Sequence, residues 1–314
     1  MKKDSADDTV LRDEIKILRK KRNAIILAHN YQPREIQDVA DLCGDSLELS
    51  IRAANTDADV IVFCGVHFMA ETASILSPNK TVLLPVKDAG CQMADMITAD
   101  LLKKKRMEYQ KVCVITYVNT TAEVKAESDI CCTSANAVSV ADSVQPSVPI
   151  LMVPDKNLAT YTKNCTHRDI HIWDGYCPIH NNLTKEQVLK IKERHREAVF
   201  LAHPECPPEV LDLADEIKST SGMIEFAKTS DKKEFIIGTE TGIIYPLSKA
   251  NPGKVFIPAS PDMVCKDMKK ITLKDIARSL KTLLPEVKVP EEIRLRAKQA
   301  VDRMLNAKQT ETSL

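Results

Sequence analysis

An internal repeat constrains this 314-residue chain more than any other feature. Four threonines, Thr9, Thr98, Thr184 and Thr272, are spaced by 89, 86 and 88 residues, and each is followed by an amphipathic segment. Acidic residues lie close behind these threonines, and a threonine ahead of an acidic first turn is typical of a helix N-cap. The spacing therefore predicts that the same helix begins four times along the chain.

Three apolar runs follow each of the first three predicted helices. The first run of each repeat ends in polar residues, at 24–31, 111–119 and 198–205. Short continuous apolar runs are typical of strands whose two faces are both covered in a parallel sheet. Each repeat is thus expected to read helix, strand, helix, strand, helix, strand.

This pattern predicts an α/β protein of three homologous three-layer α/β/α domains, with short parallel sheets arranged about a pseudo-threefold axis. The expected domains are residues 9–97, 98–183 and 184–271. The segment 272–305 is expected to form two C-terminal helices that pack back on the first domain, with Ile293, Ala297 and Val301 on one apolar face.

Composition excludes several classes of protein. Forty-four basic and forty-four acidic residues give a formal net charge of zero, which argues against a nucleic-acid partner. No stretch approaches the roughly 18 apolar residues of a membrane helix, and the opening MKKDSADD lacks the apolar core of a signal peptide. Ten cysteines without a single CxxC pair do not suggest a disulfide scaffold or a zinc ribbon. We therefore expect a cytoplasmic protein that binds no membrane.

The ends of the three first strands carry different chemistry at matching positions. Ligands of parallel α/β sheets bind beyond the carboxyl ends of the strands, so these side chains are candidates for acid–base and hydrogen-bonding roles. They are His29, Tyr117 and His203 and, two residues later, Tyr31, Asn119 and Glu205. Duplication alone does not require different groups at equivalent positions, whereas an asymmetric substrate does.

A residue with a hydroxyl group lies seventeen positions after each of His29, Tyr117 and His203, ahead of a helix-like run. These residues are Ser46, Ser134 and Thr220. Each could simply cap a helix, but three hydroxyls near one axis beside histidines favour an anionic substrate, since helix N-termini bind carboxylates and phosphates.

One cysteine follows the third strand of every repeat, seven residues before the next threonine cap: Cys91, Cys177 and Cys265. About a pseudo-threefold axis, equivalent positions converge. Three thiolates do not suit one disulfide or a closed zinc site, but they can hold a four-iron cluster and leave one iron open as a Lewis acid. The alternative is that these cysteines only fill a core.

Other residues receive less specific interpretations. His67 and His180 are expected near the entrance of the binding site, and the sequence does not decide their roles. The other three histidines are interpreted as surface or packing residues: His167, His171 and His195. Lys103–Arg106 is expected to be a solvated helix face. The cysteines inside apolar runs are expected to be buried small hydrophobes: Cys43, Cys64, Cys113 and Cys131.

Several segments together resemble quinolinate synthase, the A protein of de novo NAD synthesis. They are ILAHNYQ, CGVHFMAETA, DAGCQMAD, TYVNTTAEVKA, WDGYCPIH, AHPEC, STSGM, IIGTETG and PDMVCKDM, and the similarity spans residues 9–305. The resemblance implies three α/β domains around a cavity with one [4Fe-4S] cluster. It implies condensation of iminoaspartate (iminosuccinate), supplied by an aspartate-oxidising enzyme, with dihydroxyacetone phosphate, giving quinolinate, phosphate and two waters.

Matching motifs carry roles over to this sequence. Cys91, Cys177 and Cys265 would ligate the cluster, and PDMVCKDM lacks the CxxCxxC form of some relatives, so no local redox disulfide is expected. His29, His203 and Glu205 would line the cavity, with Glu205 suited to proton removal, and Tyr31 would transfer protons or gate the cavity. The remaining substrate-binding residues would hold carboxylates or phosphate: Ser46, Tyr117, Asn119, Ser134 and Thr220.

Two rival functions follow from the same residues. One is a different iron–sulfur hydro-lyase, and the other is a non-catalytic iron–sulfur sensor. A sensor should carry a DNA-binding or partner-binding module, and the sequence has no helix-turn-helix appendage or basic tail.

Overall fold

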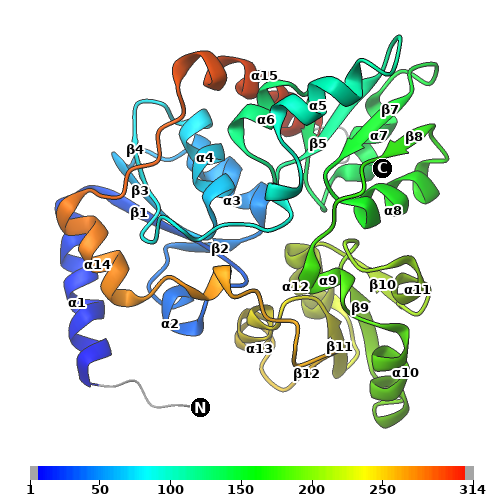
Figure 1. The fold of residues 1–314 in the computed structure, drawn as a ribbon. Coiled ribbons are helices and arrows are strands. Elements are labelled where there is room, and N and C mark those ends of the chain that lie inside the picture. Colours follow the sequence, from blue (N-terminus) through cyan, green and yellow to red (C-terminus); the bar gives the residue numbers. More distant parts are fainter. Residues whose placement is uncertain (1–5, 308–314) are drawn as a thin grey trace. The chain divides into compact units, whose positions relative to one another are not determined.

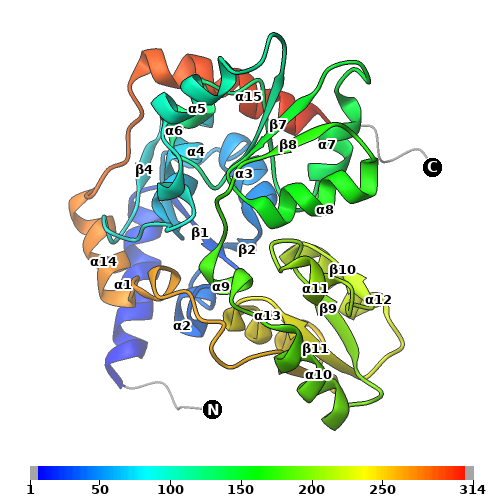
Figure 2. The ribbon, with the colours of Figure 1, turned by 45° about the vertical axis from the view of Figure 1, so that its right-hand side comes forward.

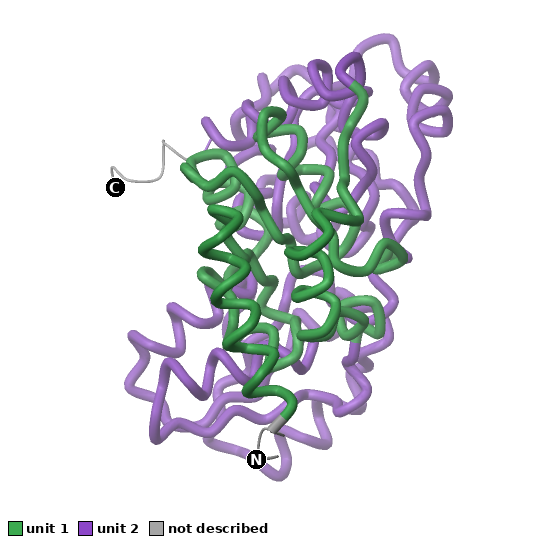
Figure 3. The backbone as a smooth tube through the Cα atoms, turned by 90° about the vertical axis from the view of Figure 1, so that its left-hand side faces the viewer, with its two compact units in different colours: residues 1–91, 265–290 green, residues 92–264, 291–314 purple. Residues whose placement is uncertain are grey.

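The computed structural model describes residues 6–307 and divides into two compact units. Unit 1 comprises residues 1–91 and 265–290, and unit 2 comprises 92–264 and 291–314; Figure 3 colours them separately. No helix among the described residues has both the length and the apolar character needed to cross a membrane.

The described residues form three four-stranded sheets, and all three have the same topology (Figure 1). In each sheet the strand order is second, first, third, fourth, and every pairing is parallel. The first sheet consists of β1 (Ala24–His29), β2 (Leu42–Gly44), β3 (Val60–Cys64) and β4 (Thr81–Leu83). The second consists of β5 (Cys113–Tyr117), β6 (Ile130–Cys132), β7 (Ile150–Val153) and β8 (Ile170–Ile172). The third consists of β9 (Val199–Ala202), β10 (Glu216–Ile217), β11 (Glu234–Gly238) and β12 (Val255–Pro258).

Helices flank the sheets, so the predicted α/β class is confirmed. In unit 1 they are α1 (Ala6–Lys21), α2 (Arg34–Gln37), α3 (Ser46–Ala54), α4 (His67–Leu76), η3 (Asp267–Lys269) and α14 (Leu273–Thr282). Unit 2 begins with η1 (Ala94–Met96), α5 (Ala99–Arg106), α6 (Ala122–Ala126), α7 (Ala137–Ser143), α8 (Lys156–Thr166) and α9 (Pro178–Asn181). It continues with α10 (Lys185–Arg194), α11 (Pro208–Leu211), α12 (Thr220–Thr229), η2 (Thr241–Ile243), α13 (Ile244–Ala250) and α15 (Glu291–Ala307).

The central strands are buried along nearly their whole length, which explains their continuous apolar sequences. All five residues of β3 and all four of β7 are buried. Such burial is expected for parallel strands covered by helices on both faces. The division at residues 9–97, 98–183 and 184–271 and the pseudo-threefold axis stay predictions.

Each sheet has one strand more than the sequence pattern predicted. The additional strands β2, β6 and β10 are two or three residues long, too short to show a periodic pattern of their own. Each pairs with the first strand of its repeat.

Three of the four predicted threonine caps are present. The side chains of Thr98, Thr184 and Thr272 accept hydrogen bonds from the third residue beyond them, at the starts of α5, α10 and α14. Thr9 is an exception, because α1 begins at Ala6 and Thr9 lies inside it. The prediction of an N-cap at Thr9 was wrong.

The two C-terminal helices pack on different repeats. α14 packs against α1, and Glu286 forms an isolated antiparallel bridge to Leu83 of β4. Within unit 2, α15 packs on α6, β6 and α7 (Figures 1 and 2). Its buried face consists of Ala297, Ala300, Val301 and Met304. Its docking is supported by Arg296, whose guanidinium lies 2.8 Å from Glu127 Oε1.

Candidate functional site

The same turn follows the first strand in the first and third repeats. In unit 1, His29 Nδ1 accepts a hydrogen bond from the backbone N–H of Tyr31 at 3.2 Å. In unit 2, His203 Nδ1 accepts one from the backbone N–H of Glu205 at 3.3 Å. With Nδ1 accepting, a neutral imidazole carries its proton on Nε2. The repeated turn therefore fixes the ring and tautomer of both predicted histidines.

Glu205 lies at the centre of the polar cluster in unit 2. Its side chain is 3% exposed, and Tyr117 Oη donates a hydrogen bond to its Oε1 at 2.6 Å. His180 Nδ1 lies 2.8 Å from the other oxygen, Oε2, and His203 Nδ1 lies 3.9 Å from Oε1. The ends of β5 and β9 thus bring together three residues that the sequence singled out separately: Tyr117, His203 and Glu205.

The electrostatic surroundings keep Glu205 ionised. Burial by itself raises the pKa of this carboxyl, but the charges of the two imidazoles and the hydrogen bonds from His180 and Tyr117 outweigh it and hold the pKa well below its usual range. A carboxylate held in this way stabilises an imidazolium formed beside it, as in catalytic triads.

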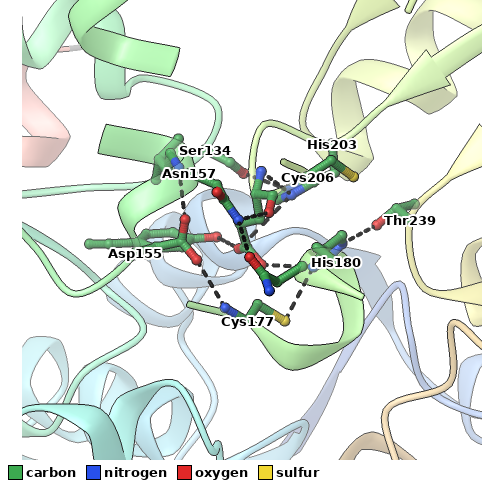
Figure 4. Close-up of polar contacts among 12 residues, drawn as sticks. Ser134, Asp155, Asn157, Cys177, His180, His203, Cys206 and Thr239 are labelled. Atoms are coloured by element: carbon green, nitrogen blue, oxygen red, sulfur yellow. Dashed lines mark hydrogen bonds and ion pairs between the residues drawn. The ribbon is translucent and has the colours of Figure 1, made fainter. Parts of the chain in front are cut away.

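His180, whose role the sequence did not decide, contacts several of these groups. Its Nε2 is 2.7 Å from Thr239 Oγ1, and its Nδ1 is 3.2 Å from Cys177 Sγ (Figure 4). Its ring stacks on that of His203 with the centroids 4.7 Å apart. His180 therefore connects a predicted cluster ligand, Cys177, to the predicted acid–base pair of His203 and Glu205.

The second repeat supplies further groups to this cluster. Ser134 Oγ lies 3.2 Å from His203 Nε2, and Asn157 Nδ2 donates to the backbone oxygen of Glu205 at 2.9 Å. Asp155 accepts hydrogen bonds from the backbone N–H groups of Leu158 and Cys177, at 2.7 and 3.0 Å. Burial, followed by the charge of Glu205, raises the pKa of Asp155 well above its usual value.

Asn119 differs from its neighbours. Its side-chain oxygen Oδ1 is buried and has no hydrogen-bond partner within residues 6–307. An unpaired buried acceptor is costly, so such atoms call for an explanation. A ligand that donates a hydrogen bond to Asn119 provides one.

The predicted hydroxyls do not act as simple caps. Ser46 and Thr220 are the first residues of α3 and α12, and the caps are the residues before them, Asp45 and Ser219. Ser134 lies ahead of α7 in the turn after β6. Two of the three hydroxyls thus lie in the first turn of a helix without serving as its cap.

The cysteines differ in burial, and the three predicted cluster ligands are among the more exposed ones. Cys91 and Cys265 in unit 1 and Cys177 in unit 2 are all partly exposed. Burial raises the pKa of Cys64 strongly, that of Cys131 to about 12 and that of Cys113 to about 11. Cys64 and Cys131 are fully buried as predicted, whereas Cys43 and Cys113 are only partly buried.

Comparison with known proteins identifies the family. The family model of quinolinate synthetase A protein matches residues 13–306 of the chain. The chain belongs to the quinolinate synthetase A protein family. It is 56% identical over 295 residues to the quinolinate synthase of Geotalea uraniireducens (strain Rf4), covering 94% of this chain and 97% of that protein. It is 52% identical to quinolinate synthase 2 of Methanosarcina acetivorans over 304 residues, 97% of this chain and 98% of that protein. The resemblance stated from the sequence motifs is therefore confirmed, and the chain is an enzyme.

Three residues of the site were not predicted from the sequence: Asp155, Asn157 and Thr239. The residues singled out after strands were those after the first strand of each repeat and the cysteine after the last. Asp155 and Asn157 follow β7, and Thr239 follows β11, so these residues also lie beyond carboxyl ends of parallel strands. The spacing of His180, three residues after Cys177, was a second available signal.

Proposed function

We propose that this enzyme condenses iminoaspartate with dihydroxyacetone phosphate to form quinolinate, phosphate and two waters. The single observation that supports this most, beside the family, is the buried Glu205 carboxylate held between Tyr117 and two imidazoles. Forming the carbon–carbon bond requires removal of a proton beside a carbonyl group, and this cluster offers the groups for that step.

Proton removal in this proposal uses His203 and Glu205 together. A carboxylate with a strongly lowered pKa is a weak base by itself, because general bases work best with a pKa near the operating pH. To accept the proton, His203 would use Nδ1 and give up the hydrogen bond from the Glu205 backbone N–H. The Glu205 carboxylate, with Oε1 3.9 Å from Nδ1, would then stabilise the imidazolium that forms. In unit 1, His29 and Tyr31 would supply the equivalent proton-transfer groups, with ring centroids 4.5 Å apart.

The substrates would bind at the starts of two helices and beside the buried side-chain oxygen of Asn119. Ser46 and Thr220 lie in the first turns of α3 and α12, so their hydroxyl groups would donate hydrogen bonds to a substrate carboxylate or phosphate. At α3 the backbone N–H groups of Leu47 and Glu48 are already bound by the Asp45 carboxylate. Asn119 Oδ1 would accept a hydrogen bond from a substrate hydroxyl or imine, which would satisfy that buried atom. Ser134 would assist by fixing His203.

We also propose that Cys91, Cys177 and Cys265 hold a [4Fe-4S] cluster. The donors fit this group, because all three thiols are partly exposed, whereas burial disfavours the thiolate of Cys64, Cys131, Cys132 and Cys206. When bound, such a cluster would supply an open iron that acts as a Lewis acid toward substrate oxygen.

The proposal is tested by anaerobic turnover. Cluster-loaded protein given iminoaspartate and dihydroxyacetone phosphate should release quinolinate and phosphate in equal amounts, measured by chromatography and a phosphate assay. An intact cluster without quinolinate would reject this function in favour of another hydro-lyase or a sensor.

Air exposure should inactivate the enzyme reversibly. A cluster held by three thiolates leaves one iron without a protein ligand, and that iron should be lost faster than from a four-thiolate cluster. Activity and iron content should fall together during aerobic handling and return with iron, sulfide and thiol. Full activity in metal-free, air-exposed protein would contradict the assigned cofactor.

A further inference from the structure

Three different metal-binding atoms lie close together in unit 2. The Cys177 Sγ, one Glu205 carboxylate oxygen and an imidazole nitrogen of His180 all lie within 4.8 Å of one another. His180 and Glu205 are 2% and 3% exposed, so two of the three donors are shielded from water. A thiolate, an imidazole and a carboxylate are ligands typical of zinc.

We propose that the cluster-free protein binds one zinc ion, or a similar divalent transition metal, through Cys177, His180 and Glu205. Tetrahedral zinc with these ligands separates neighbouring donor atoms by about 3.3–3.6 Å. The separations here are 3.2 Å from His180 Nδ1 to Cys177 Sγ and 2.8 Å from His180 Nδ1 to Glu205 Oε2, and Cys177 Sγ lies within 4.8 Å of the Glu205 carboxylate. Small side-chain movements therefore admit the metal, which replaces the His180–Glu205 contact.

The outer hydrogen bonds of the three residues match those of a metal site. Metal-bound histidines usually donate their other ring N–H to a fixed acceptor, and ligating carboxylates are themselves hydrogen-bonded. His180 Nε2 contacts Thr239 Oγ1 at 2.7 Å, which leaves Nδ1 to face the metal. Tyr117 Oη donates to Glu205 Oε1 at 2.6 Å, which leaves Oε2 to face it. Asp155 fixes the backbone N–H of Cys177.

The donor types also set which metals bind. A sulfur, nitrogen and oxygen set suits Zn²⁺, Co²⁺ or Fe²⁺, whereas Mg²⁺ and Ca²⁺ prefer oxygen ligands alone. Binding releases the thiol proton of Cys177. This zinc site and the [4Fe-4S] cluster exclude each other, since both use the Cys177 thiolate; that half of the inference rests on the proposed function.

The test uses cobalt as a spectroscopic probe of zinc. Full-length protein stripped of iron and sulfide is titrated anaerobically with Co²⁺, while near-ultraviolet and visible absorption are recorded. One equivalent should bind, with a thiolate-to-cobalt charge-transfer band and the visible bands of a low-coordinate ion; zinc should displace it and Mg²⁺ should not.

Variants locate the metal. Cys177→Ser should remove the charge-transfer band, and His180→Ala and Glu205→Gln should weaken binding. Thr239→Val, a conservative change outside the ligands, should weaken binding by about 10–100-fold. A matched control is His195→Ala, because His195 Nδ1 lies 2.7 Å from Glu234 Oε1 in a second imidazole–carboxylate pair. That variant should bind cobalt normally.

Two results would overturn the inference: a charge-transfer band that survives Cys177→Ser, or one that is lost in Cys91→Ser and Cys265→Ser. Circular dichroism checks the fold of each variant. If Cys177→Ser does not fold, cobalt binding by Thr239→Val is the deciding measurement, and unchanged affinity in that variant would contradict the site.

A last measurement separates the two proposals. Zinc-loaded protein should assemble the brown cluster chromophore more slowly than zinc-free protein, and a chelator should restore assembly. If cobalt binds at Cys177 but zinc leaves cluster assembly unchanged, the metal site stands and the assignment of Cys177 to the cluster fails.

Discussion

Replacing Glu205 by Gln is expected to lower the rate of quinolinate formation by about 10²–10⁴-fold, with iron content and visible spectrum unchanged. The substitution keeps the size of the side chain, and its amide oxygen can still accept the hydrogen bond from Tyr117. It removes the negative charge that stabilises an imidazolium on His180 or His203. The measurement is single-turnover and steady-state quinolinate formation under anaerobic conditions.

The fold must be checked in the same variant, because removing one partner of a buried ion pair can cost about 3–5 kcal/mol. Thermal unfolding of Glu205→Gln measures that loss separately from the loss of rate. Glu234→Gln is the matched control, since it removes a carboxylate from the partly exposed pair with His195. That control should turn over normally.

His203→Ala should resemble Glu205→Gln, with weaker substrate binding added. Near-normal turnover of Glu205→Gln would be compatible with the proposed reaction, but it would show that Glu205 takes no part in proton transfer.

The repeat made most of the fold predictable from local signals. Apolar runs such as residues 60–64 give buried parallel strands, and caps such as Thr184 mark helix starts. The docking of α15 was not predictable, because an apolar stripe specifies that a face is buried but not which neighbour buries it. Here the neighbour is the second repeat.

The candidate site was predictable in its positions but not in its pairs. Strand ends predicted Tyr117, His203 and Glu205, since ligands of parallel α/β sheets bind beyond the carboxyl ends of the strands. The Tyr117–Glu205 hydrogen bond joins residues 88 positions apart, and no local pattern specifies such a contact. His180 stayed open for the same reason, because its role depends on Thr239 and Glu205, which are distant in sequence.

Replacing Cys177 by Ala is expected to abolish the brown chromophore and with it all quinolinate formation. If three thiolates hold the cluster, the loss of one leaves a second iron without a protein ligand, and the cluster should not survive purification. The substitution should spare the local backbone, because Asp155 bonds to the backbone N–H of Cys177 and not to its side chain. Iron and sulfide per chain, together with the visible spectrum, provide the measurement.

Other cysteines provide the controls for this experiment. Cys43→Ala, Cys64→Ala and Cys113→Ala should keep the chromophore, although Cys64 is fully buried and its loss should lower thermal stability. Burial raises the pKa of Cys113 to about 11, so its thiol stays protonated at neutral pH and is poorly suited to bind iron. A stoichiometric cluster in folded Cys177→Ala would contradict the three-thiolate assignment. Loss of the cluster in Cys177→Ala, Cys91→Ala and Cys265→Ala alike, with all three controls intact, would tie the cofactor to the one cysteine that recurs in every repeat.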